Sequence, residues 1–287
     1  MSHRFAPKRP PSAVKQRMRS VGNIQKITKA MKMVAASKMR AAQAQTVNAR
    51  GMALPMLKLL GDLPAAEGEK HVYVPITSDK GLCGGINSTV VKYTRAALAA
   101  GGVPAGGPAG PTLVVVGEKG RAQLVRTLPD AIVGTVADTN KVKITFPQAC
   151  AIAEEVLKTE YDVAHLVFNR FVSAIRQAPT LATVLSPLAL EREAEAGGAV
   201  DSYEIEGPGR AELLQDLAEL NLATTLYSCL LESNCSEQSS RMSAMENSTK
   251  NAGEMLGKLT LTYNRTRQAS ITTELIEIIS GATALAG

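Results

Sequence analysis

Hydrophobic residues divide the sequence into three sections. In the first, residues 12–61, they recur every three or four positions, close to the 3.5-residue spacing of two helices wound around each other. We expect one long helix here, with Ser12 as its N-cap and with Gly51 and Pro55 bending or breaking it near its end. The apolar stripe of this helix is predicted to consist of Val14, Met18, Val21, Ile24, Ile27, Met31, Val34 and Met39.

The middle section, residues 70–206, alternates short β-branched runs with amphipathic stretches. This alternation predicts a mostly parallel sheet with helices on its faces, a Rossmann-like α/β domain. The stretch 99–111 is rich in Gly and Pro and is expected to be an exposed loop. The expected strands lie within 71–78, 112–117, 131–137, 163–171 and 180–186, and the expected helices within 87–100 and 146–160.

The third section, residues 207–287, predicts a second long helix. Pro208 suits its first turn, and no other Pro follows before Leu285. A continuous helix of this length would extend about 115 Å at 1.5 Å per residue, more than a compact domain of this size could bury. Polar residues interrupt its apolar spacing around 234–240.

The two long helices need partners, because a lone helix with an exposed apolar stripe is not stable in water. One helix enters the α/β domain and the other leaves it, so we expect them to pair in an antiparallel two-helix coiled coil. The predicted fold class is therefore α/β plus long helices. The far end of the second helix, including 271–285, is expected to need another protein around it.

The charge distribution adds a possible partner surface. From Met1 to Gly61 there are thirteen Lys or Arg and no Asp or Glu, whereas from Pro208 onward nine acids face six Lys or Arg. Lys26 and Lys29 fit a solvated face and an electrostatic guide equally well. A nucleic-acid arm is disfavoured, because the basic stretch lacks aromatic residues for stacking and carries no recognised motif.

The sequence shows no spacing typical of a metal or cofactor site and no segment typical of a membrane span. The four cysteines have no CxxC spacing and the three histidines lie far from any cysteine pair, so we expect free thiols and neither metal nor cofactor. No apolar run is long enough to cross a bilayer. The basic residues 1–11 form a predicted tail, either the remainder of an organelle transit segment or a disordered end.

Four segments carry a family resemblance: "NIQKITKAMKMVAASKM" (23–39), "SDKGLCGGIN" (78–87), "SEQSSRMSAMENS" (236–248) and "LTYNRTRQASITTELIEIISGA" (261–282). In this order they resemble the gamma subunit of the rotary ATP synthase. The spacing Ile271-Thr272-Thr273-Glu274, then Glu277, then Gly281-Ala282, is similar to the C-terminal pattern of that family. Segments 264–269 and 274–282 resemble mitochondrial members.

The resemblance implies a function and a set of partners. The chain would be a non-catalytic subunit, the central rotor shaft that couples rotation of the c-ring to conformational changes in three catalytic beta subunits. Its partners would be three alpha and three beta subunits, epsilon and delta-type stalk subunits and the c-ring, with no nucleic acid. It would lie at the matrix side of the mitochondrial inner membrane, peripheral to the bilayer.

The resemblance also implies the residues of the subunit interface. Arg267, Gln268, Thr272 and Glu274 would bond loops of the surrounding subunits, with Glu277 nearby and Arg241 lower on the shaft. Met31 and Lys32 would face acidic segments of beta. The pattern alone favours a solvated helix face for Gln268 and Glu274, and packing within the helix pair for Met31.

An enzymatic alternative would use the α/β domain to bind a nucleotide. Only Gly117 and Gly120 follow the "TLVVV" run, which falls short of a GxGxxG motif, and no GxxxxGK[ST] is present. Residues 78–81 follow a predicted strand and are expected to form a turn. Cys229 and Cys235 lie inside the second long helix, so a thiol switch is not expected.

Overall fold

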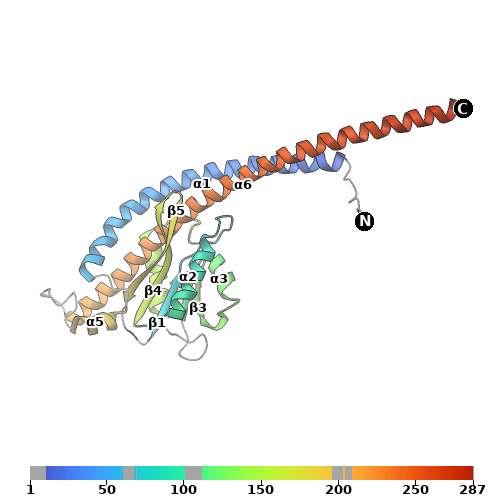
Figure 1. Ribbon diagram of the computed structural model, residues 1–287. Helices are drawn as coiled ribbons and strands as arrows, with labels where there is room; N and C mark the ends of the chain where they lie inside the picture. Colours follow the sequence, from blue (N-terminus) through green and yellow to red (C-terminus); the bar gives the residue numbers. More distant parts are fainter. Residues whose placement is uncertain are drawn as a thin grey trace. The chain divides into compact units, whose positions relative to one another are not determined.

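The structure, a computed structural model, describes residues 11–60, 68, 70–100, 112–195, 203 and 209–286. The chain forms two compact units, one from the residues up to Val34 together with those from Ala244, and one from Ala35 to Ser243. Two long helices, α1 (Pro11–Leu60) and α6 (Arg210–Ala286), contribute to both units (Figure 1). Both predicted long helices are therefore confirmed.

A five-stranded sheet is the centre of the second unit. Its strand order is β3-β2-β1-β4-β5, and all neighbours are parallel except β4 and β5, which pair antiparallel. The predicted strands and the mostly parallel sheet are confirmed. The strands are β1 (His71–Pro75), β2 (Thr112–Val116), β3 (Ile132–Val136), β4 (Val163–Ser173) and β5 (Arg176–Leu185).

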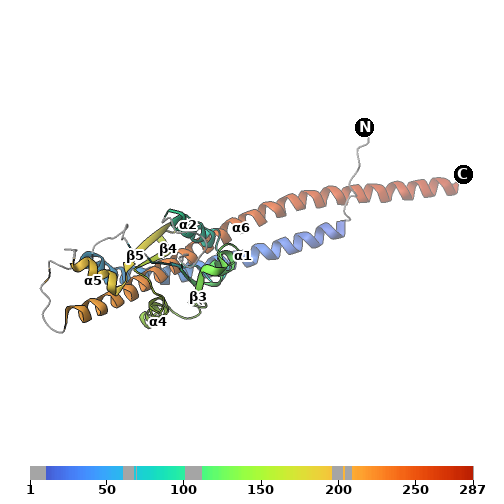
Figure 2. The same ribbon diagram turned by 90° about the horizontal axis from the view of Figure 1, so that it is seen from below.

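Helices cover both faces of this sheet, with α2 and α4 on opposite sides (Figure 2). The sequence did not indicate α3 and α5, because seven and nine residues are too few for a clear helical period. The helices are α2 (Ile86–Ala100), α3 (Glu118–Leu124), α4 (Phe146–Leu157) and α5 (Pro187–Glu195), with a 3-10 turn η1 at Pro129–Ala131.

Alternation along the strands sorts the core into two layers. Val72 and Val74 of β1 pack with α4 and α6, whereas Tyr73 between them packs with α2 and α3. Both valines are fully buried. Burying an apolar side chain of this size contributes about 1.5–3 kcal/mol. Because both faces of the strand are buried, every position along it favours an apolar residue, and the strands are continuous apolar runs.

In the first unit, the start of α1 pairs with the later part of α6. Thr249 Oγ1 donates to Thr28 Oγ1 at 2.8 Å, and Lys32 Nζ lies 2.6 Å from Glu246 Oε1. As the residue number rises along α1 it falls along α6, so the helices are antiparallel. In the second unit, Thr46 Oγ1 donates to the Leu231 carbonyl at 3.2 Å with the same polarity.

Most buried positions of α1 follow a seven-residue period and agree only in part with the predicted stripe, of which Val14, Val21 and Met39 are buried. The predicted members Ile24, Ile27 and Val34 are 52–58% exposed. One partner helix covers a narrow strip only, and small side chains on that strip let two helices approach closely. The buried positions that lie seven residues apart are Val14, Val21, Thr28, Ala35, Ala42 and Ala49, and Met39, Thr46 and Leu60 are buried as well.

One predicted feature of α1 is wrong, and a second is wrong in part. The helix begins at Pro11, so Ser12 lies in the first turn and is not the N-cap; a proline suits this turn because its missing N–H needs no partner there. The helix also continues unbroken through Pro55 to Leu60, so the predicted break is wrong, whereas the predicted bend stays a prediction. Pro55 removes the bond to the carbonyl of Gly51, but Gly51 is exposed and water can replace that bond.

Three predictions fall wholly or mostly outside the described residues. The basic tail is undescribed except for Pro11, which is helical, and the Gly- and Pro-rich loop is undescribed from 101 onward. Pro208, expected in the first turn of the second long helix, is also undescribed; the helix itself begins at Arg210.

Candidate subunit interface

The last turns of α6 carry apolar side chains that nothing in the described chain covers. All side chains from 271 to 284 are exposed. In Figure 1 this part of α6 continues alone beyond the start of α1. The large apolar side chains, 49–67% exposed, are Ile271, Leu275, Ile276, Ile278 and Ile279. A contiguous apolar surface of this kind marks an interaction site.

Five of the predicted interface residues lie on about three turns, 267–277, which overlap the start of this segment. Thr272 Oγ1 donates to the Gln268 carbonyl at 2.9 Å, and Ser270 Oγ donates to Glu274 at 3.0 Å. Among the described residues, the side chains of Arg267, Gln268 and Glu277 have no hydrogen-bond or ion-pair partner. The segment therefore offers free donors and acceptors beside the apolar surface.

On α1, Met31 and Lys32 lie in the first unit. Met31 is half-buried. Lys32 pairs with Glu246 while their side chains are 38% and 58% exposed, so the ion pair is solvated and weak. Next to them, Ile24, Ile27 and Val34 form an exposed apolar stripe that the sequence assigned to the helix seam.

Arg241 belongs to the second unit and bonds within it. Its guanidinium lies 2.6 Å from Glu237 and donates to the Gly81 carbonyl at 3.4 Å, and the two side chains are 13% and 8% exposed. Burial raises the pKa of Glu237, and the Arg241 charge opposes that shift. Arg241 is therefore already engaged inside the chain.

The two glycines after β2 serve packing. Gly117 has φ +95°, and a Cβ there would lie 2.3 Å from the Thr77 carbonyl oxygen. A Cβ on Gly120 would lie 2.5 Å from Thr77 Oγ1. The Gly120 N–H donates to that hydroxyl at 2.9 Å, so Thr77 occupies the space beside both glycines.

Residues 78–81 form the expected turn. Ser78 Oγ donates to the Lys80 carbonyl at 2.7 Å, and Asn87 Oδ1 accepts from the Ser78 N–H at 2.9 Å. The turn is followed by Gly84, whose positive φ of 63° favours glycine.

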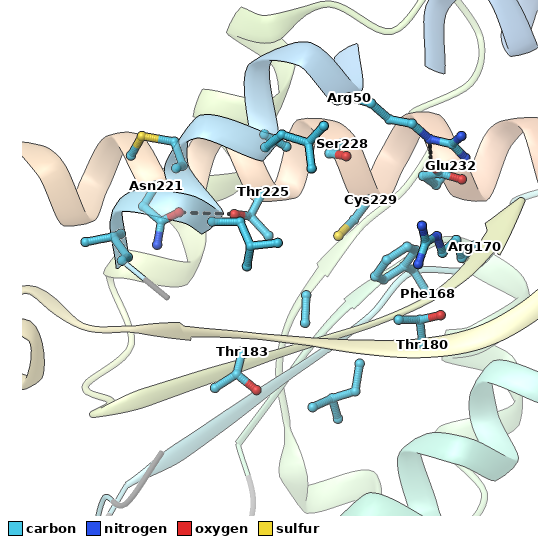
Figure 3. A pocket seen from close by; sticks show the side chains of 17 residues that line it. Arg50, Phe168, Arg170, Thr180, Thr183, Asn221, Thr225, Ser228, Cys229 and Glu232 are labelled. Carbon is cyan, nitrogen blue, oxygen red and sulfur yellow. Dashed lines mark hydrogen bonds and ion pairs between the residues drawn. The ribbon is translucent and has the colours of Figure 1, made fainter. Parts of the chain in front are cut away.

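A cavity of about 400 Å³ lies in the second unit between the end of α1, the β4–β5 pair and α6 (Figure 3). Leu54, Leu57 and Phe168 give it apolar walls. Arg50 and Glu232 close one end, where Arg50 Nε lies 2.7 Å from Glu232 Oε1. Cys229 also lines it, and burial raises the pKa of this thiol.

No described helix has both the length and the hydropathy that a membrane crossing requires. Within the described ranges, no group of three or more His, Cys, Asp or Glu could hold a metal ion. All four cysteines are free.

Comparisons with known proteins decide the family. A family model described as ATP synthase matches residues 11–285. The mitochondrial ATP synthase subunit gamma of Ipomoea batatas is 52% identical over 96% of this chain and 85% of its own length. The Arabidopsis thaliana mitochondrial subunit gamma is also 52% identical, over 95% of this chain and 84% of its own.

The chain belongs to the ATP synthase gamma subunit family. A chain of the Tetrahymena thermophila mitochondrial ATP synthase central stalk and c-ring structure is 34% identical, with a TM-score of 0.65 over 77% of this chain and 98% of that one. A chain from the Euglena gracilis mitochondrial ATP synthase has a TM-score of 0.82 over 96% of this chain and 94% of its own, and at 22% identity supports the fold alone.

These comparisons confirm the predicted family, its mitochondrial type, the α/β fold with long helices and the central-stalk function. The individual interface residues of this gamma subunit stay predictions. The structure brings Arg267, Gln268, Thr272, Glu274 and Glu277 together on one helix segment and places Met31 and Lys32 in the same unit, whereas Arg241 lies in the other. Ile24, Ile27 and Val34 were predicted to lie in the helix seam, so their exposed surface was not recognised as part of a candidate interface.

Proposed function

We propose that this gamma subunit is the central rotor shaft that couples rotation of the c-ring to conformational changes in three catalytic beta subunits, and that it catalyses no reaction itself. The single observation that supports this most is the wholly exposed segment 271–284 of α6. A helix with five large exposed apolar side chains needs a sleeve of other chains around it.

The proposed sleeve consists of three alpha and three beta subunits. Epsilon and delta-type stalk subunits and the c-ring would bind elsewhere on the chain, which would lie at the matrix side of the inner membrane without entering it. The solved relatives support this set, since they come from a central stalk with c-ring and from a mitochondrial ATP synthase rotor.

The mechanism requires an asymmetric neighbour for three chemically identical sites. The shaft acts as a ligand whose contact energy differs among the conformations of beta, so rotating it redistributes them. Biasing one site by four orders of magnitude takes about 5.5 kcal/mol of differential contact. Charge-assisted hydrogen bonds that Arg267 donates and Glu274 accepts, with those of Gln268 and Thr272, are proposed to supply part of it.

Each predicted domain is assigned one part of this function. Residues 12–61 and 207–287 would form the shaft and its tip, and 70–206 the foot on the c-ring. A non-catalytic foot is supported by Gly117 and Gly120, whose free space Thr77 already fills.

The double variant Gln268→Leu, Thr272→Val tests the proposed contacts. We expect it to fold and assemble but to lower the rate of ATP synthesis, because the amide and the hydroxyl can no longer bond the surrounding loops. Synthesis is measured in vesicles that contain the assembled enzyme under an imposed proton gradient.

The matched control is Gln215→Leu, Thr89→Val, which makes the same chemical changes at exposed positions of the second unit. It should leave the rate unchanged. A normal synthesis rate in the Gln268 and Thr272 double variant would contradict the assigned contacts.

A further inference from the structure

A polar stretch of α6 is buried where an amphipathic helix would be apolar. Ser236 and Ser239 have no exposed surface, and Glu232, Glu237 and Gln238 are 4–8% exposed. These residues lie in the second unit, away from the exposed tip and from the five interface residues predicted there. Burying so many polar groups is unfavourable unless each finds a partner.

The serine hydroxyls find those partners outside their own helix. Ser236 Oγ donates to the Asn169 carbonyl at 2.8 Å, and Ser240 Oγ to the Cys83 carbonyl at 2.6 Å. Ser239 Oγ donates to the carbonyl of Ala174 at 2.7 Å. A serine within a helix often bonds to the carbonyl four residues earlier, as the exposed threonines of α6 do, whereas these three serines bond to carbonyls of the α/β domain.

The charged residues of the stretch extend the same connection. Glu232 accepts from the Phe171 N–H at 2.8 Å and from Arg50 Nε at 2.7 Å. Glu237 accepts from the side chain of Asn140 at 3.1 Å. Arg241 donates to Glu237 and to the Gly81 carbonyl in the loop after β1.

These partners lie around about half of α6. At 100° per residue, the bonding positions between Glu232 and Arg241 cover about 200° of the helix circumference within three turns. Apart from Arg50 of α1, the partners come from the loop after β1, the loop after β3, and the end of the β4–β5 hairpin that contains its turn. They lie at the carboxyl ends of the parallel strands, beside the point between β1 and β4 where the strand order reverses. In other α/β folds a ligand binds at this crevice; here α6 occupies it.

We propose that residues 232–241 are a torque-bearing joint, which fixes α6 against rotation about its own axis within the α/β domain. Apolar packing is not directional, so a helix held by it alone can turn and repack. Hydrogen bonds to backbone carbonyls depend steeply on distance and angle, and turning α6 breaks them on both sides. The joint rests on the proposed function, because only a rotor carries torque between its shaft and its foot.

The triple variant Ser236→Ala, Ser239→Ala, Ser240→Ala removes the three hydroxyls with little change in volume. In vesicles that contain the assembled enzyme, ATP-driven proton pumping per ATP hydrolysed is measured while the opposing proton gradient is raised. We expect a normal ratio of protons pumped to ATP hydrolysed at low load and a loss of about half or more at high load. Each removed hydrogen bond is individually modest, so the remaining contacts hold α6 at low load and fail only under high torque. Hydrolysis itself should continue.

The matched control is Thr89→Ala, Thr159→Ala, Thr180→Ala, whose hydroxyls bond only carbonyls within four residues of themselves. It should keep the normal ratio at every load. If the serines have a purely structural role, the variant should give less assembled enzyme, but the ratio of protons pumped to ATP hydrolysed should be normal at every load. If the triple variant does not assemble, Ser240→Ala alone is measured in the same way.

A normal ratio at the highest load in the assembled serine variant overturns the joint. The proposed function fails separately, if the foot of the unchanged gamma subunit does not rotate against the alpha and beta subunits during hydrolysis, as followed by a bead attached to the foot. Rotation together with load-independent pumping in the variant would leave the rotor intact and remove only the joint.

Discussion

Two segments of the same helix meet opposite conditions. In the second unit, residues 222–240 of α6 are largely buried, whether apolar like Leu226 or polar like Ser236. In the first unit, residues 271–284 are all exposed, although several are large and apolar. Side-chain hydrophobicity therefore does not decide burial in this helix. Burial depends on whether packing partners are available, and among the described residues this chain supplies them to 222–240 and not to 271–284.

The largest expected contrast comes from truncating one leucine in each segment. Leu226→Ala should lower the free energy of unfolding by about 2–5 kcal/mol, because it leaves a cavity between α6 and the sheet. Leu275→Ala should change it by less than about 0.5 kcal/mol, since that side chain is half exposed already. Urea unfolding of the purified chain, followed by circular dichroism, measures both. Equal losses would break the comparison.

Ion pairs between α1 and α6 should show the next contrast. The Arg50–Glu232 hydrogen bond raises the pKa of Arg50, and Glu232 is 6% exposed. Arg50→Ala should destabilise the second unit by about 1–3 kcal/mol, because a buried carboxylate loses its charged partner. Arg50→Lys, which retains the charge, should recover part of the loss in the same unfolding measurement. A loss below the error of that assay would show that the Phe171 N–H alone satisfies Glu232.

Acid should weaken the second unit through His165. Burial, and then the neighbouring His71, lower the pKa of His165 to about 4. A depressed histidine pKa favours the neutral form in the folded state, so this stability is complete above the unfolded pKa of about 6.5 and falls as the pH drops towards 4. Urea midpoints between pH 7 and pH 4 measure the loss, and His165→Asn should flatten the curve. An unchanged slope in that variant would assign the acid sensitivity to other groups.

The smallest effect is expected at the solvated pair of the first unit. Lys32→Gln should change stability by about 0–1 kcal/mol, because both members of the Lys32–Glu246 pair are well exposed. Added salt should reduce even this difference. A loss as large as that of Arg50→Ala would mean that exposure does not distinguish the two pairs.

The five strand regions and both long helices could be predicted from the sequence, because each rests on a local period that backbone geometry imposes. Residues 267–277 could be proposed as an interface because their pattern is local as well. The short helices α3 and α5 could not be predicted from the sequence, since they have too few residues to show a helical period. Burial of Ser236, Ser239 and Ser240 was also beyond reach, because their partner carbonyls lie 65–157 residues away along the chain.

The sequence by itself determined that two helices too long for one domain must pair and that one must end in an apolar stripe needing other chains. Only the tertiary structure decided which side chains form the seam. It buried Thr28 and Ala35 and left Ile24 and Val34 exposed, because a close helix pair selects for fit along a narrow strip. It also turned a polar interruption in α6 into a hydrogen-bonded contact with the α/β domain, since folding brought distant carbonyls within reach of its hydroxyls.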